Sequence, residues 1–202
     1  MTSAPGVAKT QAQGHAPADR VALRSRLLAA RERLAADVNA AAAQHALTAQ
    51  LAPLLRQLEP EVLGLYSPMR GEFDPCEAAR TARLTGVALA LPYARRKPHE
   101  MHYRAWNGEA PPGAVDECGV PAPAAASIVV PDVVLVPCVG FTQSLWRLGY
   151  GGGYFDRWLA QHPHVTAVGV AWSACEIAPQ DWSVQPHDLP LTIVVTESGI
   201  VS

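Results

Sequence analysis

Short runs of consecutive apolar residues, set between helical and glycine-rich segments, constrain the fold of this chain more than any other feature. A strand that is apolar at consecutive positions buries both of its faces, which is typical of a parallel sheet covered by helices on both sides. Such runs occupy residues 62–66, 87–91, 133–136, 165–171 and 193–195, and a further run, 101–106, alternates. The 202 residues are enough for one domain with a substantial core. The sequence therefore predicts the α/β class, as a single three-layer α/β/α domain with a mostly parallel sheet.

The N-terminal part of the predicted domain is helical. Residues 19–58 are rich in Ala, Leu, Arg and Glu, and leucines such as Leu47 and Leu51 recur at helical spacing. Residues 37–39 favour a joint between two helices, and Pro60 ends the second one. We therefore expect an N-terminal segment of two consecutive helices.

The remaining segments predict two short helices, a lead-in and a long loop. Residues 75–84 and 154–162 have helical patterns, the first opened by proline. Residues 1–19 are poor in apolar side chains and are expected to be a disordered lead-in to a domain that spans 20–202. Residues 108–127 are rich in Pro, Gly and Ala and are expected to be a surface connection that could cover a ligand.

Charge and cysteine content exclude several classes of protein. The 16 basic and 18 acidic residues give a formal net charge of -2, which provides no overall attraction to nucleic acid or anionic membranes. The chain has no apolar run long enough to span a membrane and no signal-peptide core at its start. The four cysteines lie far apart without a CxxC pair, which favours reduced thiols. We expect a cytoplasmic monomer that binds neither nucleic acid nor membrane.

A glycine-rich turn at residues 149–153 carries the clearest chemical signal. It follows the strand at 133–136 through a loop and precedes a helix, so its backbone N–H groups and the helix N-terminus can bind one anion. Glycine suits this role because a Cβ would hold phosphate oxygens away and disfavour positive φ. Arg147 adds a planar cation for phosphate, and Asp156 adds the opposite charge. The spacing matches neither a Walker loop nor a dinucleotide motif, so a simple flexible turn is the alternative.

Five groups of residues occur in a defined order along the chain. They are Arg20-Val-Ala-Leu-Arg24, Leu65-Tyr-Ser-Pro-Met-Arg-Gly-Glu72, Leu91-Pro with Met101-His-Tyr-Arg-Ala-Trp106, Arg147-Leu-Gly-Tyr-Gly-Gly-Gly-Tyr-Phe-Asp156, and His187-Asp188 with Val194-Val-Thr-Glu197. In this order they resemble the 5-formyltetrahydrofolate cyclo-ligases, also called methenyltetrahydrofolate synthetases. The resemblance runs from about Arg20 to Glu197, which is nearly the whole chain.

The resemblance implies an enzyme that uses ATP and Mg²⁺ to close 5-formyltetrahydrofolate to 5,10-methenyltetrahydrofolate, releasing ADP and phosphate. Transfer of the γ-phosphoryl group to the formyl oxygen would turn that oxygen into a good leaving group. The neighbouring amine of the substrate could then attack intramolecularly, so the protein mainly orients the reactants and neutralises charge. Small molecules, folate and ATP, are the expected partners.

The resemblance also implies roles for individual residues. The catalytic residues would be Arg147 and Tyr154. ATP would contact Arg20, Arg24, Arg147, Leu148, Gly149, Tyr150, Gly151, Gly152, Gly153 and Tyr154. The folate would contact Ser67, Met69, Glu72 and Trp106. Mg²⁺ would be held by Asp156 and Asp188, which supply hard oxygen ligands.

Other interpretations stay open. Gly152 stands where many relatives have lysine, and residues 141–147 differ from the usual pattern. A catalytically altered homologue that binds folate or nucleotide in a regulatory role is therefore one alternative. An unrelated phosphate-binding enzyme, such as a sugar-phosphate isomerase, is another. The basic run at 95–97 is either a solvated loop or a site that steers a polyanionic substrate.

Overall fold

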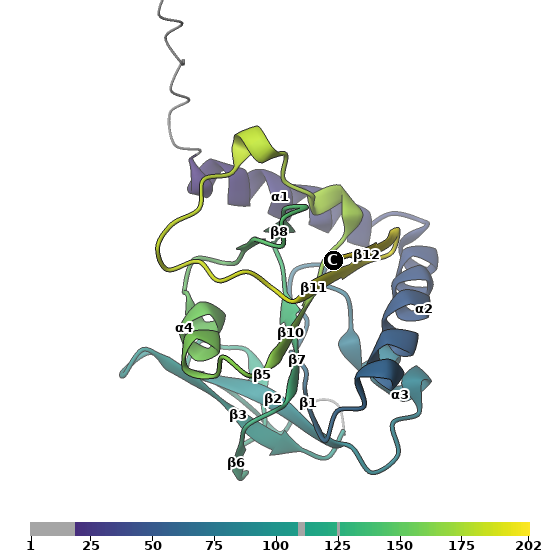
Figure 1. The fold of residues 1–202 in the computed structure, drawn as a ribbon, viewed down its shortest axis with the longest axis vertical. Coiled ribbons are helices and arrows are strands. Elements are labelled where there is room, and N and C mark those ends of the chain that lie inside the picture. The colour runs from purple at the N-terminus through teal and green to yellow at the C-terminus, as the bar shows by residue number, and fades with distance from the viewer. Residues whose placement is uncertain (1–18, 109–111, 125) are drawn as a thin grey trace, which may run out of the picture.

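An eight-stranded sheet runs through the middle of the computed structural model, which describes residues 19–108, 112–124 and 126–202 (Figure 1). In spatial order its strands are β12 (Gly199–Val201), β11 (Ile193–Thr196), β10 (Thr166–Val170), β7 (Val133–Pro137), β1 (Val62–Gly64), β2 (Ala88–Arg95), β3 (Glu100–Trp106) and β6 (Ile128–Val129). The five strands from β11 to β2 are mutually parallel, and β12, β3 and β6 add antiparallel edges. The predicted mostly parallel sheet is confirmed. The expected lead-in lies outside the described residues, apart from Asp19.

The direction in which strands are added to the sheet reverses between β1 and β7. From β1 the chain moves outwards to β2 on one side, and from β7 it moves through β10 to β11 on the other. In register, Leu63 lies beside Val133 and Gly64 beside Val134, so the segments after both strands leave the same edge of the sheet. In open α/β sheets, ligands bind in the crevice at such a switch point.

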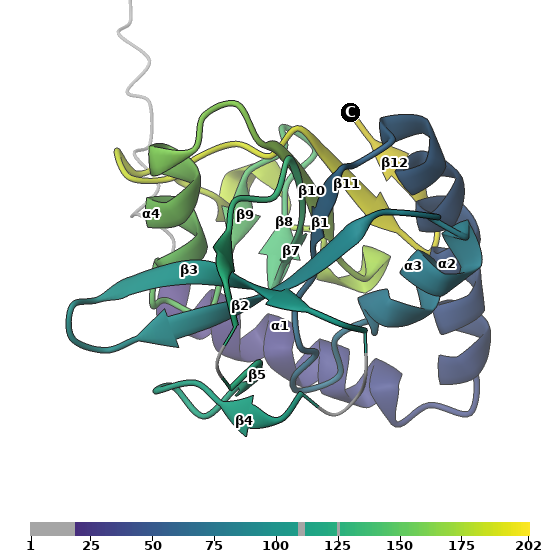
Figure 2. The ribbon, with the colours of Figure 1, turned by 90° about the horizontal axis from the view of Figure 1, so that it is seen from below.

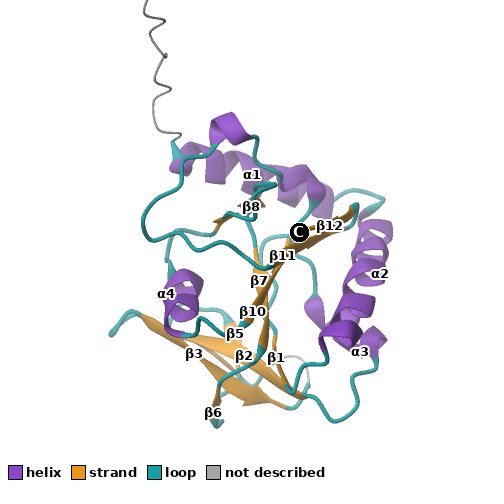
Figure 3. Ribbon diagram, in the orientation of Figure 1, coloured by secondary structure: helices purple, strands orange, loops and turns teal. Residues whose placement is uncertain are grey.

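Helices cover both faces of the sheet. On one face lie α1 (Arg20–Ala35), α2 (Ala40–Leu58) and α3 (Pro75–Ala82), and on the other lies α4 (Tyr154–Gln161) (Figure 1, Figure 3). Strand β7 contributes to the hydrophobic core on both faces. Val133 and Leu135 pack in the core under α1, α2 and α3, whereas Val134 and Val136 pack in the core under α4. Apolar residues at consecutive positions thus bury both faces, and the predicted α/β/α layering is confirmed.

The N-terminal helical segment has the predicted form of two consecutive helices. The Asp19 carboxylate accepts hydrogen bonds from the N–H groups of Val21 and Ala22 at 2.9 and 3.3 Å, which caps the start of α1. The interruption between α1 and α2 includes residues 37–39, where the sequence predicts a joint. Asp74 caps α3 in the same way, because its carboxylate accepts the N–H of Cys76 at 2.9 Å.

The described part of the segment 108–127 runs over the surface, as the sequence predicts, but it also contains regular structure. It contains the hairpin of β4 (Ala114–Val115) and β5 (Pro121–Ala122), which lies beside the β2–β3 pair (Figure 2). The Asp116 side chain is buried and accepts the N–H of Ala94 in β2 at 3.1 Å, and those of Cys118 and Val120 at 2.8 Å. These bonds shape the hairpin and hold it against β2.

Short elements complete the described part of the chain. Strands β8 (Gly140–Phe141) and β9 (Arg147–Leu148) pair with each other just after β7. Two 3₁₀ turns, Ser173–Cys175 and Pro179–Asp181, follow β10. No helix in the described ranges combines the length and apolar character needed to cross a membrane.

Candidate active site

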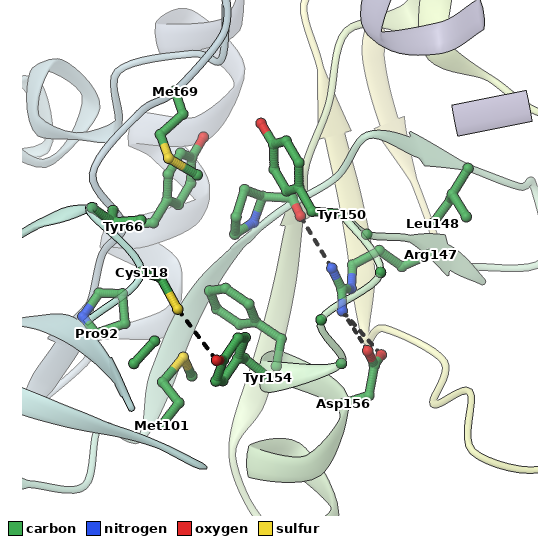
Figure 4. Close-up of a pocket in the computed structure, with 18 of the residues that line it drawn as sticks. Tyr66, Met69, Pro92, Met101, Cys118, Arg147, Leu148, Tyr150, Tyr154 and Asp156 are labelled. Carbon is green, nitrogen blue, oxygen red and sulfur yellow. Dashed lines mark hydrogen bonds and ion pairs between the residues drawn. The ribbon is translucent and has the colours of Figure 1, made fainter. Parts of the chain in front are cut away.

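A cavity of about 480 Å³ opens at the carboxyl ends of β1 and β7, where the direction of strand addition reverses. It is bordered by the N-terminal part of α1, the segment after β1, the β2–β3 pair with its hairpin, the turn at 147–156, and residues 185–188. In Figure 4, Met69, Pro92 and Met101 lie on one side of the cavity, whereas Arg147 and Asp156 lie on the other. The cavity therefore has an apolar half and a charged half.

The apolar half is formed by the sheet and the β4–β5 hairpin. Its lining consists of Tyr66, Met69, Pro92, Ala94, Met101, Cys118 and Val120. Ser67 also borders the cavity, and its hydroxyl donates to the carbonyl of Pro121 at 2.6 Å, which ties the segment after β1 to the hairpin. An apolar lining with few polar groups is suited to a flat, largely apolar ligand that those groups orient.

The charged half is built on the glycine-rich turn between β9 and α4. Gly151 and Gly153 have φ angles of 99° and 64°, which glycine adopts without the steric cost that a side chain brings. A Cβ at Gly149 would lie 2.6 Å from Nη1 of Arg147, so a side chain at this position would displace that guanidinium. The turn delivers the N-terminus of α4 to the cavity, an arrangement that favours an anion.

Arg147 and Asp156 form an ion pair in this half (Figure 4). Nη2 of Arg147 donates to both carboxylate oxygens of Asp156, at 3.0 and 2.9 Å, and Nη1 donates to the carbonyl of Pro137 at 3.3 Å. The Arg147 side chain is only 5% exposed. The guanidinium is therefore held in place before any ligand binds, which is the condition for electrostatic preorganisation.

Arg20 and Asp188 form a second pair between the two ends of the chain. Arg20 donates to the carboxylate at 3.0 and 2.5 Å, and the N–H of Gln185 donates at 2.7 Å. Burial alone would raise the pKa of Asp188, but these hydrogen bonds outweigh it and hold the pKa below its usual range. Asp188 is thus a carboxylate at neutral pH.

Arg24 lies over the glycine-rich turn. Its Nε donates to the carbonyl of Gly149 at 2.7 Å, and its guanidinium carbon is 3.4 Å from where a Cβ of Gly151 would stand. Burial, and then the nearby charge of Arg20, lower the pKa of Arg24. With Arg147, these residues bring three arginines to the charged half of the cavity.

Glu72 connects the two halves of the cavity. Its Oε1 accepts the hydroxyl of Tyr150 at 2.9 Å and Nη1 of Arg31 at 3.3 Å, and its Oε2 accepts the N–H of Met69 at 2.9 Å. Burial raises the pKa of Glu72, and Arg31 is the strongest of the groups that oppose this increase. The charged form of Glu72 is therefore disfavoured by burial and stabilised by the hydrogen bonds that it accepts.

Tyr154 opens α4 at the boundary of the apolar half. Its hydroxyl donates to the carbonyl of Arg95 at 3.2 Å and lies 3.2 Å from Sγ of Cys118, and the His99 ring packs edge-on at 4.4 Å (Figure 4). Burial, followed by the hydrogen bond with Cys118, raises the pKa of Tyr154 to about 12. Tyr154 is therefore a neutral hydroxyl at physiological pH.

The cavity brings together nearly all of the residues that the sequence nominates. Those that line it are Arg20, Arg24, Ser67, Met69, Glu72, Arg147, Leu148, Gly149, Tyr150, Gly151, Gly152, Gly153, Tyr154, Asp156 and Asp188. Trp106 is the exception, because it borders a second depression beside α3, together with Cys76 and Arg80. Strand β3 places Met101 in the cavity and Trp106 at its other end, too far along the strand to share the site.

The carboxylates in the charged half are compatible with Mg²⁺. Mg²⁺ keeps several waters and is usually bound by one or two protein carboxylates together with phosphate oxygens. Asp156 and Asp188 both border this half, and a carboxylate that accepts hydrogen bonds from arginine retains further lone pairs. Among the described residues no three His, Cys, Asp or Glu side chains cluster as a complete protein-only metal site. The donor set therefore suits Mg²⁺ bound with a phosphorylated ligand.

Sequence reasoning missed several residues of the cavity and its support. Tyr66 follows β1, Pro92 and Met101 lie in β2 and β3, and Cys118 lies in the β4–β5 hairpin, and the motifs that contain the first three assign them no role. Arg31 is different, because it follows Leu23 and Leu27 at intervals of four and therefore lies on the buried face of α1. An arginine in that helical register indicates a buried partner.

The fold and the cavity define a doubly wound α/β protein with a ligand site at its switch point. Residues 16–197 match the model of the 5-formyltetrahydrofolate cyclo-ligase family. The chain is 30% identical over 145 residues to the 5-formyltetrahydrofolate cyclo-ligase of Mycolicibacterium smegmatis. This alignment covers 68% of this chain and 74% of that protein. This chain belongs to the 5-formyltetrahydrofolate cyclo-ligase family, whose named members are enzymes.

Other relatives match over shorter stretches. The cyclo-ligase of Escherichia coli K12 is 39% identical over 71 residues, 34% of this chain and 38% of its own length. The Mycoplasma pneumoniae cyclo-ligase is 34% identical over 67 residues, 33% of this chain and 39% of its own length. The alignments with these two relatives thus span well under half of each relative.

Solved structures of two methenyltetrahydrofolate synthetases share the fold. The 5,10-methenyltetrahydrofolate synthetase of Mycoplasma pneumoniae superposes with a TM-score of 0.71 at 20% identity, covering 89% of this chain and 99% of that one. The enzyme from Aquifex aeolicus gives a TM-score of 0.69 at 25% identity, covering 90% and 91% of the two chains.

Proposed function

We propose that this protein is an ATP-dependent 5-formyltetrahydrofolate cyclo-ligase that forms 5,10-methenyltetrahydrofolate, ADP and phosphate. The observation that carries the proposal is a single cavity with an apolar half beside Glu72 and a charged half beside the glycine-rich turn. A folate needs an apolar environment and a nucleoside triphosphate needs a charged one, and the reaction requires the two to lie next to each other. The cyclo-ligase names of the relatives support the same reaction.

The apolar half is the subsite that we assign to 5-formyltetrahydrofolate. Met69 and Met101 supply apolar, polarisable surface for the ring system, and Glu72 supplies the acceptor for its N–H groups. Ser67 contributes its backbone, because its hydroxyl is already bonded to Pro121. Trp106 is left out of this subsite because it borders the other depression.

The charged half is the subsite that we assign to the triphosphate of ATP. The turn at 149–153 and the N-terminus of α4 border this half, together with the arginines Arg20, Arg24 and Arg147. Arg157 adds a cation outside the cavity, where it donates to the carbonyl of Gly152 at 2.7 Å. Arginines therefore provide the positive charge at this turn.

The reaction requires the protein to orient the reactants and to neutralise charge. The γ-phosphoryl group passes from ATP to the formyl oxygen, the neighbouring amine attacks the formyl carbon, and phosphate leaves with that oxygen and the amine proton. Arg147, held in the charged half by Pro137 and Asp156, would neutralise the oxygens of the transferred group. Tyr154 stays neutral and could donate its one hydroxyl hydrogen there by giving up its bond to the carbonyl of Arg95.

Mg²⁺ is the metal we propose for this site. When bound, it supplies positive charge beside the triphosphate, which phosphoryl transfer generally requires. Asp156 and Asp188 are the carboxylates of the charged half that would hold it.

The experiment is a spectrophotometric assay of the conjugated methenyl product with 5-formyltetrahydrofolate, ATP and Mg²⁺. We expect turnover that stops without ATP and falls on the order of 100-fold in Asp156→Asn, because Arg147 loses its charged partner. Asp181→Asn is the matched control, since Asp181 pairs with Arg26 at the exposed surface. It should leave turnover unchanged.

Three outcomes would contradict the proposal. Folded protein that binds ATP and folate without turnover would indicate the catalytically altered homologue. Binding of sugar phosphates but not ATP, measured by calorimetry, would indicate an unrelated phosphate-binding enzyme. Full turnover without ATP would refute phosphoryl activation. The expectations of a monomer and of a cytoplasmic location stay predictions.

A further inference from the structure

A directed chain of hydrogen bonds runs from α1 through the glycine-rich turn to the segment after β1. Arg31 is 1% exposed, and its Nη2 donates to the hydroxyl of Tyr150. That hydroxyl donates in turn to Oε1 of Glu72 at 2.9 Å. A tyrosine hydroxyl has one hydrogen, so the hydrogen bonds point from Arg31 to Tyr150 to Glu72.

Arg31 also fastens the two loops that leave the switch point. Its Nε donates to the carbonyl of Arg70 at 3.0 Å, and its Nη1 donates to the carbonyl of Cys138 at 3.3 Å and directly to Glu72 at 3.3 Å. Arg70 follows β1 and Cys138 follows β7. One buried guanidinium thus connects the loops on both sides of the cavity to α1, which its fork of donors makes possible.

The donors of Glu72 decide which of its oxygens can serve a ligand. A carboxylate has about four acceptor positions, two on each oxygen. Oε1 already accepts Arg31 and Tyr150, whereas Oε2 accepts the N–H of Met69 alone. The acceptor position left over is on Oε2, and Glu72 borders the cavity.

We propose that Arg31 is a positioning residue of the cyclo-ligase reaction, which acts through the Tyr150 hydroxyl to fix Glu72 for folate and to couple folate binding to the glycine-rich turn. This inference rests on the proposed function, since it takes Glu72 as the folate acceptor. Tyr150 lies between Gly149 and Gly151, so movement of the turn around a nucleotide would be transmitted to Oε1 of Glu72. Neither Arg31 nor the direct Tyr150–Glu72 bond follows from the sequence motifs.

The charge state of Glu72 gives this arrangement a measurable signature. Burial favours the protonated form, and the donors Arg31, Met69 N–H and Tyr150 favour the carboxylate. The other titratable groups near Glu72 are Tyr66 and Cys138, whose pKa values burial raises far enough to keep both neutral. Removing a donor must therefore raise the pKa of Glu72.

The test uses Tyr150→Phe and Arg31→Lys in the full chain, with Tyr93→Phe and Arg33→Lys as matched controls. Tyr93 lies outside the cavity under Arg104, and Arg33 is exposed on the same helix as Arg31. Calorimetry measures the Kd of 5-formyltetrahydrofolate between pH 5 and 8, with and without β,γ-methylene-ATP. Thermal unfolding verifies that each variant is folded, and Tyr150→Phe is the milder change should Arg31→Lys fail to fold.

Folate affinity should fall at low pH as Glu72 becomes protonated. We expect this fall to begin about one pH unit higher in Tyr150→Phe, because a hydrogen bond to the carboxylate is lost. At pH values below the wild-type pKa of Glu72 this corresponds to a Kd raised roughly 10-fold, and the difference should disappear at pH values above the pKa of both proteins. The ratio of the Kd values with and without the nucleotide analogue should move towards 1. The control variants should match the wild type in both measurements.

Two results would overturn the inference while leaving the function intact. One is a Tyr150→Phe variant whose acid limb and Kd ratio equal those of the wild type. The other is weaker nucleotide binding with an unchanged folate profile, which would assign Tyr150 to the nucleotide alone. Wild-type protein that binds no 5-formyltetrahydrofolate at any pH would instead refute the proposed function, and the inference with it.

Discussion

Replacing Gly149 by alanine would place a methyl group directly against the guanidinium of Arg147. The added Cβ would lie 2.6 Å from Nη1, whereas ordinary contacts begin at 3.4 Å, so the guanidinium must retreat by about 0.8 Å. That retreat acts on the hydrogen bonds of Arg147 to Asp156, at 2.9 and 3.0 Å, and to the carbonyl of Pro137, at 3.3 Å. The backbone of Gly149 itself needs no left-handed conformation, so the effect is one of contact alone.

The magnitude follows from which atoms must move. The guanidinium is the end of a flexible side chain, so we expect a loss of only about 1 kcal/mol in the free energy of unfolding, or about 3 °C in Tm. Misplacement of a group that neutralises charge in the transition state costs more, and a shift of this size is expected to lower kcat/KM about 100-fold. Activity should therefore fall much further than stability.

The assay is formation of the methenyl product by wild type, Gly149→Ala, Arg147→Met and the double variant. If alanine acts by displacing Arg147, it has nothing left to displace once residue 147 is methionine, and the two effects should not add. Gly113→Ala is the matched control, because no atom lies within 4 Å of its added Cβ and its φ is ordinary. That control should keep full activity.

Two results would refute this reasoning. Gly149→Ala could retain kcat/KM to within about threefold, and then the position of Arg147 would not matter to the reaction. Alternatively, Gly149→Ala could lower kcat/KM by the same factor in the Arg147→Met variant as in the wild type. In that case the alanine would act on the turn itself.

Two further predictions concern stability. Arg20→Gln should lower the free energy of unfolding by about 1 kcal/mol at pH 7, because the pKa of Asp188 is depressed and its pairing stabilises the fold above the usual carboxyl pKa of about 4. The difference should vanish in urea titrations as the pH falls through the folded-state pKa, and an equal difference at pH 7 and pH 3 would contradict the assignment. Gly169→Ala should cost about 1–3 kcal/mol, because its Cβ would lie 2.5 Å from Leu191 and 3.0 Å from Val194 in the core. An unchanged Tm would show that this part of the core can expand.

The elements follow from local sequence patterns where those patterns are strong. Consecutive apolar residues at 133–136 predict a strand buried on both faces, and β7 is such a strand. The helix that opens at Tyr154 after the glycine-rich turn and the joint at 37–39 are likewise found as predicted. Short elements such as β6, β8 and β12 carry no comparable signal, because two or three residues show no periodicity.

The segment 108–127 shows what composition leaves undecided. Proline and glycine favour a surface connection that could cover a ligand, but they do not predict the hairpin that borders the cavity through Cys118 and Val120. The cause is Asp116, whose carboxylate satisfies three backbone N–H groups, one of them from Ala94 in a different strand. Such a contact between distant segments leaves no periodic signal.

The candidate site was predicted from motifs and the resemblance they carry, and in the structure all of the nominated residues except Trp106 line one cavity. Trp106 lies at the far end of β3 from Met101, a separation that follows from strand geometry once the site is located. The helical register of Arg31 indicates a buried partner, but which partners it has depends on how α1 packs against the loops after β1 and β7.

By itself the sequence determined the layers, the buried central strands and the glycine-rich turn, because each depends on neighbours within a few positions along the chain. The tertiary structure alone decided that Arg20 pairs with Asp188, 168 residues away, and that Arg31 reaches Glu72 through Tyr150. These partners are set by which strand lies beside which, and strand order is fixed by cooperative packing of the whole core. No local period encodes that order, so the electrostatics of the site became visible only in the folded chain.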